Sequence, residues 1–540
     1  MLSSAKIGTS SWRYYTNSAP CAATEYYLGV GEAPGYWHGR GLAALGLEPG
    51  AVGSEAQLEA LFARALHPST REQLGRAWRS DGVTGFDLTF SAPKSVSALW
   101  AWGDSGTAWE LRAAHKAAVA AALGYLDAHA SASRRGVDGV EQVGSAGLVA
   151  ACFDHRTSRC ADPQLHTHAL VLNKVQCADG VWRSLDATEL FGHKKSAGMI
   201  YQAALRSEIT SRLGLVFDTA DTHGQAEIIG VPSGLLKLWS KRTAQITPEA
   251  AGKIAEYEQS LGRSLTSGER AAVTKTAVLK TRPGKTHQHP MALAEGWAAE
   301  AAAAGYHRED VVAGVQEAAR QAVRQPPASG AAIAVAAIQA AAGLRSTFSR
   351  ADVAGQVAAR LPGDGRSAQE VVATVERLTD EALELDAAVS VGSHPRGVTA
   401  RASDARWAGA TVLAAEARVL SLAERGRAAG YGLVHPAVLI TSLADTGLDA
   451  DQHAAVRALA GDGDFVSVLT APAGAGKTVT LGAAARLWRG EGYRVIGLAP
   501  SARAAAELAS ATGGTADTLA KWIHDHRRRG LLPGHERART

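Results

Sequence analysis

Three histidines near residue 160 have the chemistry and the spacing of a metal site. His166 and His168 lie in the run Leu165–Leu172, whose alternating pattern predicts a β-strand with both imidazoles on one face. The apolar run Leu148–Phe153 predicts a neighbouring strand, and antiparallel pairing would bring His155 beside the other two histidines. Three imidazoles on one face can bind a divalent cation and leave positions open for a substrate oxygen. The alternative is three ordinary polar residues on a half-exposed strand.

Two pairs of adjacent tyrosines lie near the N-terminus, Tyr14–Tyr15 and Tyr26–Tyr27. A tyrosyl oxygen can attack a phosphodiester, and the covalent phosphotyrosine that results conserves the bond energy for religation. Two pairs would allow two such steps. Taken alone, however, tyrosines this close together are more simply explained as packed aromatic side chains.

A carboxylate lies in the middle of another predicted strand. The run GFDLTFSAPKSVS begins at Gly85, and its aromatic and leucine side chains alternate with Asp87 and Thr89. A carboxylate at such a position is unfavourable unless it is exposed or has a partner. A metal-binding histidine, whose second ring nitrogen needs an acceptor, is one such partner. Taken alone, an ordinary surface aspartate is the simpler interpretation of Asp87.

A phosphate-binding loop is predicted towards the C-terminus. The run Phe465–Thr470 predicts a strand that leads into APAGAGKT, and a helical sequence follows. Backbone amides and a lysine of such a loop hold phosphates, while a hydroxyl reaches Mg²⁺. The residues expected to do this are Gly474, Gly476, Lys477 and Thr478. Ala471 stands where the strict pattern has glycine, so the match is imperfect.

Composition is typical of a soluble globular protein of several domains. The 540 residues are 46% hydrophobic and 20% charged, and the net charge of +4 permits nucleic-acid binding without requiring it. The four cysteines lack the CxxC spacing of a zinc knuckle, so we expect reduced thiols. No apolar run approaches the roughly 20 residues of a membrane span. The N-terminus has no apolar signal-peptide core, so a cytoplasmic protein is expected.

Together these segments closely resemble the TrwC/TraI-type conjugative relaxases, the MobF family of HUH endonucleases. The matching pieces are the paired tyrosines, FDLTFSAPKSVS from Phe86, HRTSRCADPQLHTHALVLN from His155 and SKRTAQI from Ser240. They occur in the family's order over about 300 residues. The resemblance implies an α+β fold, in which a palm-like antiparallel sheet with flanking helices precedes a helical region and a partial α/β P-loop domain.

The resemblance also implies a role for each site residue. His155, His166 and His168 would bind a divalent metal, Mg²⁺ or Mn²⁺, and Asp87 would be the active-site carboxylate that supports them. Tyr14 would be the first nucleophile and Tyr26 the second. Arg156 stands where relatives often carry an acidic residue, and we expect this departure to change only the surface charge.

The implied reaction is the nicking of single-stranded DNA at a transfer origin. A bound metal would polarise a phosphate oxygen, which matters because tyrosine, with a pKa near 10, is scarcely ionised at neutral pH. DNA would remain on Tyr14 through its 5′ phosphate. Lys94 and Lys194–Lys195 are candidates for phosphate contacts, and a type IV secretion coupling protein is an expected partner. The alternatives are a non-catalytic DNA-binding fragment of a relaxase-helicase and a rolling-circle replication nickase.

The C-terminal segment resembles the start of a RecD-like superfamily 1 helicase. Leu448–Gln452 resembles the motif whose glutamine reads adenine, here Gln452, and Ala499–Ala505 resembles the next strand-end motif. ATP is therefore a possible second cofactor. Because no acidic magnesium-binding strand follows before Thr540, we expect a truncated helicase that does not unwind DNA.

Changes in composition and in hydrophobic pattern along the sequence predict three domains. Residues 1–305 would form the relaxase domain, 306–425 an Ala-rich helical connecting region, and 426–540 the partial helicase domain. A DNA-gripping role for the Ala-rich region is the alternative, which composition disfavours.

Overall fold

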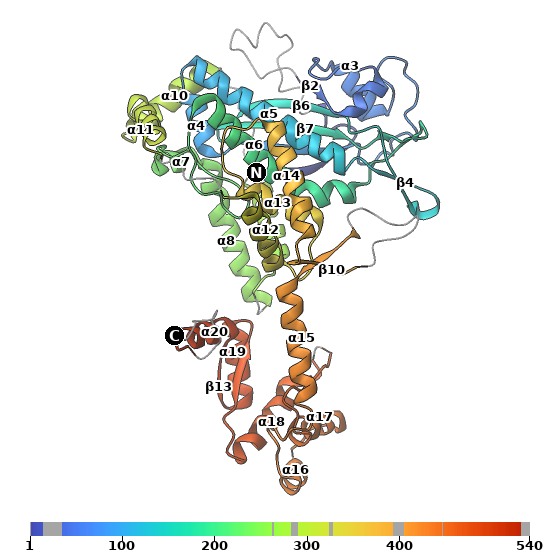
Figure 1. The fold of residues 1–540 in the computed structure, drawn as a ribbon, viewed down its shortest axis with the longest axis vertical. Helices are drawn as coiled ribbons and strands as arrows, with labels where there is room; N and C mark the ends of the chain where they lie inside the picture. The colour runs from blue at the N-terminus through green and yellow to red at the C-terminus, as the bar shows by residue number, and fades with distance from the viewer. Residues whose placement is uncertain are drawn as a thin grey trace. The chain divides into compact units, whose positions relative to one another are not determined.

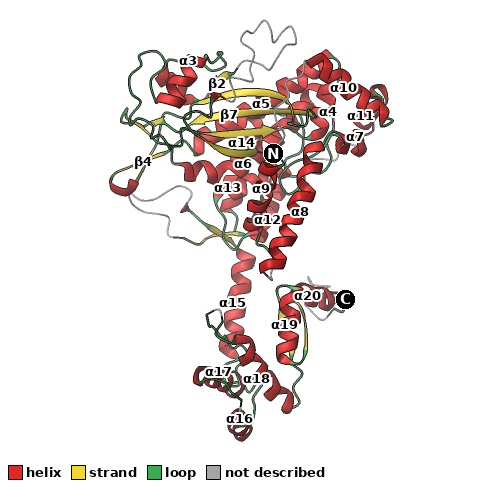
Figure 2. Cartoon of the chain, turned by 180° about the vertical axis from the view of Figure 1, so that it is seen from behind, coloured by secondary structure: helices red, strands yellow, loops and turns green. Residues whose placement is uncertain are grey.

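The computed structural model describes residues 2–13, 35–261, 264–281, 290–322, 328–392, 404–444, 446–472 and 474–530. The chain packs into two units (Figures 1 and 2). The first comprises Met1–Glu249 with Ala277–Val412, and the second comprises Ala250–Thr276 with Leu413–Thr540.

A five-stranded antiparallel sheet lies at the centre of the first unit, in the order β1-β3-β7-β6-β2. In that order the strands are Leu2–Ile7, Gly85–Ser91, Pro163–Leu172, Ala150–Thr157 and Tyr36–His38. The long central strands β3, β7 and β6 are the three that the sequence predicts from the period-two pattern. The strand expected over the run from Gly85 to Ser97 ends at Ser91, however, and a helix begins at Lys94. Hydrophobic side chains alternate along β3, where Phe86, Leu88 and Phe90 are buried on one face.

Long helices cover that face of the sheet. They are α4 (Lys94–Trp102), α5 (Ser105–His129) and α6 (Ala187–Leu213), and they share one hydrophobic core with the sheet. Asp104 and Asp186 cap the N-termini of α5 and α6, because each carboxylate accepts a hydrogen bond from a backbone amide of the first turn.

The opposite face of the sheet is covered by the chain between residues 35 and 78. This segment contains a short 3₁₀ helix (Arg40–Leu45), α3 (Glu55–Leu58) and a π-helical turn (Glu59–Ala63). Its side chains pack with Leu170 and Phe153 of the sheet in a second core. The sheet is therefore enclosed on both faces, and the polar residues between these cores stand out as candidates for function.

Helices from the predicted connecting region belong to the first unit: the two that begin at Arg350 and Ala368 pack against α6, and the one that begins at Gly330 packs on those two (Figures 1 and 2). They are α12 (Gly330–Leu344), α13 (Arg350–Arg360) and α14 (Ala368–Glu384), and their buried side chains belong to the same core as the sheet. Each begins at a serine cap. The first packing unit therefore extends to Val412, because apolar side chains of α13 and α14 complement α6, while the domain limits expected from the sequence stay a prediction.

The other elements of the first unit are peripheral, and α8, α9 and α15 also contribute residues to the second unit. The small strands are β4 (Ser133–Arg135), β5 (Glu141–Val143), β8 (Val175–Gln176), β9 (Trp182–Arg183), β10 (Ala388–Ser390) and β11 (Trp407–Gly409). The helices are Val137–Gly139, α7 (Ser233–Leu238), α8 (Lys241–Leu261), α9 (Ser267–Lys280), α10 (Pro290–Ala303), α11 (Arg308–Gln321) and α15 (Ala410–Arg425). No helix among the described residues is both long enough and apolar enough to span a bilayer.

The second unit has a small parallel sheet and several helices. They are α16 (Pro436–Leu443), α17 (Ala450–Gly461), α18 (Lys477–Gly490), β12 (Ile496–Ala499), α19 (Ala502–Thr512), β13 (Thr515–Thr518) and α20 (Leu519–Arg528). The strand predicted at Phe465–Thr470 is wrong, because this segment has no regular structure. The Phe465 amide donates to the Gly426 carbonyl, but no strand pairs with this segment among the described residues, and a strand needs a paired neighbour to satisfy its backbone. Val466 and Val468 are accordingly exposed.

Candidate active site

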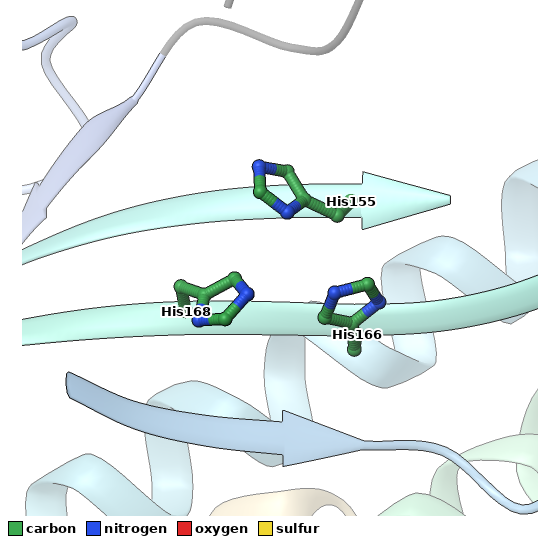
Figure 3. A group of neighbouring side chains, drawn as sticks. All are labelled: His155, His166 and His168. Carbon is green, nitrogen blue, oxygen red and sulfur yellow. The ribbon is translucent and has the colours of Figure 1, made fainter. Parts of the chain in front are cut away.

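Three histidine side chains converge on the face of the sheet opposite α5 and α6 (Figure 3). His155 on β6 lies directly across from His166 on β7, and His168 follows two residues later on the same face. One ring nitrogen of each residue lies within 4.8 Å of those of the other two. The ring centroids are 5.0 to 5.3 Å apart. The antiparallel pairing that the sequence predicts therefore brings the three imidazoles together.

Two of these histidines have their Nδ1 atoms fixed by acceptors. Nδ1 of His168 is 2.9 Å from both carboxylate oxygens of Asp87, and Nδ1 of His166 is 3.0 Å from the carbonyl oxygen of Gln164. An ionised carboxylate and a carbonyl can only accept, so both Nδ1 atoms must carry the proton. When the ring is neutral, each Nε2 then keeps its lone pair, the form that binds a metal.

Asp87 is held in place by a second contact. The hydroxyl of Thr89 donates to its carboxylate at 3.2 Å, and Asp87 is only 5% exposed. Both residues come from β3, on the face away from Phe86 and Leu88, as the alternation predicts. The donor set fits a divalent cation: three imidazoles, one supported by a buried carboxylate.

A buried polar chain lies on the other side of the same strands, and sequence reasoning missed it. His115 on α5 bonds to the Tyr201 hydroxyl and to the Thr167 hydroxyl, both at 2.8 Å. Thr167 in turn donates to Asp154 at 2.6 Å. Burial lowers the pKa of His115 to about 3, so its ring is neutral. Thr167 lies between His166 and His168 in the sequence and points to the opposite face of β7. These hydrogen bonds therefore fix the strand that carries both histidines to α5.

Not every predicted site residue lies in the described part of the chain. Tyr14 and Tyr26 fall outside the described residues, as do the second members of both pairs. Of the lysines expected to contact phosphate, Lys94 donates to the carbonyl of Pro163 at 2.9 Å, and burial lowers its pKa. Lys194 donates to the Ser4 hydroxyl at 3.2 Å, which places it against β1.

The candidate nucleotide site has the backbone of a phosphate-binding loop. Gly474 and Gly476 adopt positive φ values of 82° and 73°, which glycine tolerates best, and α18 begins at Lys477. The ammonium group of Lys477 donates to the carbonyls of Ala471 and Pro472, both at 2.7 Å, so it folds over the loop.

Two further predicted residues adjoin this loop. Gln452 contacts it, since its amide nitrogen is 3.4 Å from the Ala475 carbonyl. Thr478 is exposed in the first turn of α18.

Comparison with known proteins defines the class of protein to which this fold and site belong. The model of the TrwC relaxase family matches residues 9–304, which is more than half of the chain. The chain therefore belongs to the TrwC relaxase family. Residues 447–539 match a family described as an AAA domain. The chain is thus an α+β relaxase-family protein with an AAA-type segment.

Several relatives share the N-terminal part. The multifunctional conjugation protein TraI of Escherichia coli is 33% identical over 306 residues, which cover 54% of this chain and 15% of TraI. TraI of strain K12 is also 33% identical, over 313 residues. This chain therefore spans less than a fifth of the length of those relatives. Structures of the conjugative relaxase TrwC with oriT DNA, metal-bound and metal-free, are 30% identical, with TM-scores of 0.46. They cover 57% of this chain and 100% of the TrwC chains.

Proposed function

We propose that this chain is a conjugative relaxase that nicks single-stranded DNA at a transfer origin by metal-assisted attack of a tyrosine. The convergence of His155, His166 and His168 beside Asp87 is the observation that carries the proposal. Family membership supports it, because the TrwC and TraI relatives are named for conjugation. TrwC is described in complex with oriT DNA, which supports the same kind of substrate here.

The metal site would consist of the three imidazoles, with Asp87 orienting His168. A bound divalent cation, Mg²⁺ or Mn²⁺, would polarise a non-bridging oxygen of the scissile phosphate and stabilise the developing charge. The Nε2 atoms of His166 and His168 would be the metal ligands, because the Gln164 carbonyl and Asp87 accept hydrogen bonds from the Nδ1 atoms of the two rings. The buried contact between His115 and Thr167 restrains the strand that carries two of the ligands.

The proposed nucleophile is Tyr14. Its phenol oxygen would form a bond to the scissile phosphorus as the bond from phosphorus to the 3′ oxygen breaks. The phenol proton is lost and the leaving 3′ oxygen gains one. The product would be a 5′-phosphotyrosyl link and a free 3′ hydroxyl, and Tyr26 would serve a second transfer. These assignments rest on the order of the family motifs.

The roles of the three predicted domains follow from the same family motifs. We propose that residues 1–305 carry the nicking activity, that 306–425 support it structurally, and that 426–540 belong to a RecD-like P-loop domain. ATP would bind through Lys477, Thr478, the loop glycines and Gln452. A coupling protein of a type IV secretion system would be the partner in the cytoplasm.

The test is adduct formation with single-stranded oligonucleotides taken from the candidate origin. The full chain with Mg²⁺ should yield a covalent protein–DNA band on a denaturing gel, and EDTA should abolish it. Tyr14→Phe should lose the band while Tyr15→Phe keeps it. His166→Ala should also lose it, whereas His223→Ala, at an exposed histidine outside the cluster, should not. An adduct that persists in excess EDTA would exclude the metal-assisted mechanism.

A further inference from the structure

The turn that joins β6 to β7 lies between two of the candidate metal ligands. It follows Thr157 and ends before Pro163, with His155 on one side in the sequence and His166 on the other. A bulge interrupts the pairing of the two strands between His155 and Thr157. A bulge bends its strand and disrupts the ladder of hydrogen bonds. The position of His155 across from His166 therefore depends on how the turn beyond the bulge is held.

Asp162, at the end of this turn, binds the first residue of α8. The side chain is fully buried, and one carboxylate oxygen accepts the backbone amide of Lys241 at 2.9 Å. The first amides of a helix have no partner within it and carry a partial positive charge, so a carboxylate is favourable there. This contact fixes the turn to the N-terminus of α8.

The ammonium group of Lys241 completes this contact. The second oxygen of Asp162 is buried and accepts no hydrogen bond among the described residues, but it lies 3.4 Å from that ammonium. A buried carboxylate without a compensating charge is costly, so the ammonium matters for the stability of this arrangement. Lys241 also donates to the carboxylate of Glu300 on α10 at 2.7 Å, which fixes its position.

A second contact from α10 holds the middle of the turn. The indole nitrogen of Trp297 donates to the carbonyl oxygen of Ala161 at 2.7 Å. Ala161 has a φ of 59°, a strained value for a residue other than glycine, and such values persist only where the surrounding contacts impose them. The Trp297 hydrogen bond is one contact that does so.

The start of β7 is bound by α4. The ammonium of Lys94 donates to the carbonyl of Pro163 at 2.9 Å, and the hydroxyl of Ser97 accepts the amide of Leu165 at 3.0 Å. Lys94 and Ser97 belong to the run APKSVS, and Lys241 belongs to SKRTAQI. Two sequence motifs that supply no candidate metal ligand therefore meet at the turn between the strands that supply all three.

We propose that Asp162 is a positioning residue, which fixes the geometry of the three-histidine site together with Lys241, Trp297 and Lys94. These four side chains are called here the hairpin anchor. They hold the turn and, through it, the pairing that sets His155 across from His166. A loosened turn would let the two imidazoles separate, so a cation would lose a donor and bind more weakly. The inference rests on the metal site of the proposed function.

The test measures metal affinity without DNA. Isothermal titration of the full chain with Mn²⁺ gives the affinity of the wild type and of each variant. Asp162→Asn keeps the shape of the side chain but removes its charge. It should weaken Mn²⁺ binding about tenfold, the lower end of what loss of an outer contact costs a metal site. Lys241→Met, at a side chain that is 40% exposed, is the milder change and should act in the same direction. Lys241→Arg should restore most of the affinity, because it keeps the positive charge.

Asp127→Asn is the matched control for a general loss of stability. Asp127 is also buried; its carboxylate accepts the backbone amides of Arg40 and Leu148, both at 2.8 Å, and pairs with the Arg40 side chain at 3.4 Å. These contacts lie before the start of β6, at its far end from His155. Asp127→Asn should lower the urea midpoint by a similar amount to Asp162→Asn and still bind Mn²⁺ as the wild type does.

A second pair of variants tests the Trp297 contact. Trp297→Phe removes the hydrogen bond to the turn and should weaken Mn²⁺ binding severalfold. Trp239→Phe is its control, because Nε1 of the buried Trp239 has no hydrogen-bond partner among the described residues. Electron paramagnetic resonance of the Cu²⁺-loaded chain reports the donors of the ion directly. Its hyperfine splitting should change in the anchor variants and stay as in the wild type in both controls.

The hairpin anchor and the nicking function can fail separately. Wild-type Mn²⁺ affinity in Asp162→Asn and Lys241→Met, or an equal loss of affinity in Asp127→Asn, would overturn the anchor. If the wild-type chain then forms the covalent adduct, the nicking function stands. If the anchor variants lose affinity while the wild-type chain forms no adduct with any metal, the anchor positions a metal site and the nicking function is wrong.

Discussion

Replacing Asp87 with asparagine tests the proposed metal site most directly. The carboxylate lies 2.9 Å from Nδ1 of His168 through both oxygens and is only 5% exposed. Asparagine has nearly the same shape and can still accept one hydrogen bond, but it carries no charge. The substitution therefore removes the charge that makes Nε2 of His168 a better donor, without opening a cavity.

The size of the effect follows from this contact. Loss of an acceptor behind a metal-binding histidine typically weakens metal affinity about 10- to 100-fold, which is about 1.4 to 2.7 kcal/mol. The Asp87 contact belongs at the upper end, because a buried charge is screened less than an exposed one. The metal-free protein should lose little stability, since a buried charge is replaced by a neutral isostere.

Isothermal titration with Mn²⁺ measures this affinity, and thermal melting in EDTA measures the stability of the metal-free protein. Asp81→Asn is the matched control, because its carboxylate is exposed and pairs only with Arg79 in the described structure. Asp87→Asn should bind Mn²⁺ at least tenfold more weakly than the wild type and the control. Equal affinity of all three proteins would refute the role assigned to the Asp87–His168 contact.

Three further predictions concern the rest of the chain. Lys477→Ala should weaken binding of a fluorescent ATP analogue at least tenfold, and unchanged binding would exclude the P-loop as its site. Leu378→Ala, at a fully buried position of α14, should lower the free energy of unfolding by about 2 to 5 kcal/mol in urea, and no loss would contradict the docking of α14. Burial lowers the pKa of His193 to about 4, below its unfolded value of 6.5. The unfolded chain therefore takes up this proton first, and stability present above pH 6.5 is lost towards pH 4. His193→Gln should flatten that loss in urea midpoints measured across this range, and an identical slope would count against the prediction.

The strands of the site could be predicted from the local sequence because each strand has its own alternating pattern of apolar and polar residues. Alternation of Phe86, Leu88 and Phe90 with Asp87 is set by the two-residue period of a strand that has one apolar face. The same argument placed His166 and His168 together. The pattern misleads at Phe465–Thr470, which has no partner strand in the part of the chain that the structure describes, because alternation does not reveal whether a neighbour exists to accept the hydrogen bonds.

Composition does not reveal how the alanine-rich helices pack. A helix that connects two domains and a helix that packs into one domain can have the same alanine-rich sequence, since small apolar residues suit either role. The capping serines of α12, α13 and α14 are visible in the sequence, but the fit of α13 and α14 against α6 is not. A cut after residue 305 would expose that side of α6.

The sequence by itself singled out the candidate residues: the histidines and the P-loop through residue type and spacing, and Asp87 and the tyrosine pairs through the family resemblance. Only the tertiary structure decided how they are held. Strand register brought His155 across from His166, and side-chain geometry placed Asp87 on the Nδ1 of His168. It also assembled the His115–Thr167 contact from residues far apart along the chain. Such contacts depend on the packing of helices on a sheet. Many side chains contribute to the free energy of that packing, so no single sequence motif predicts it.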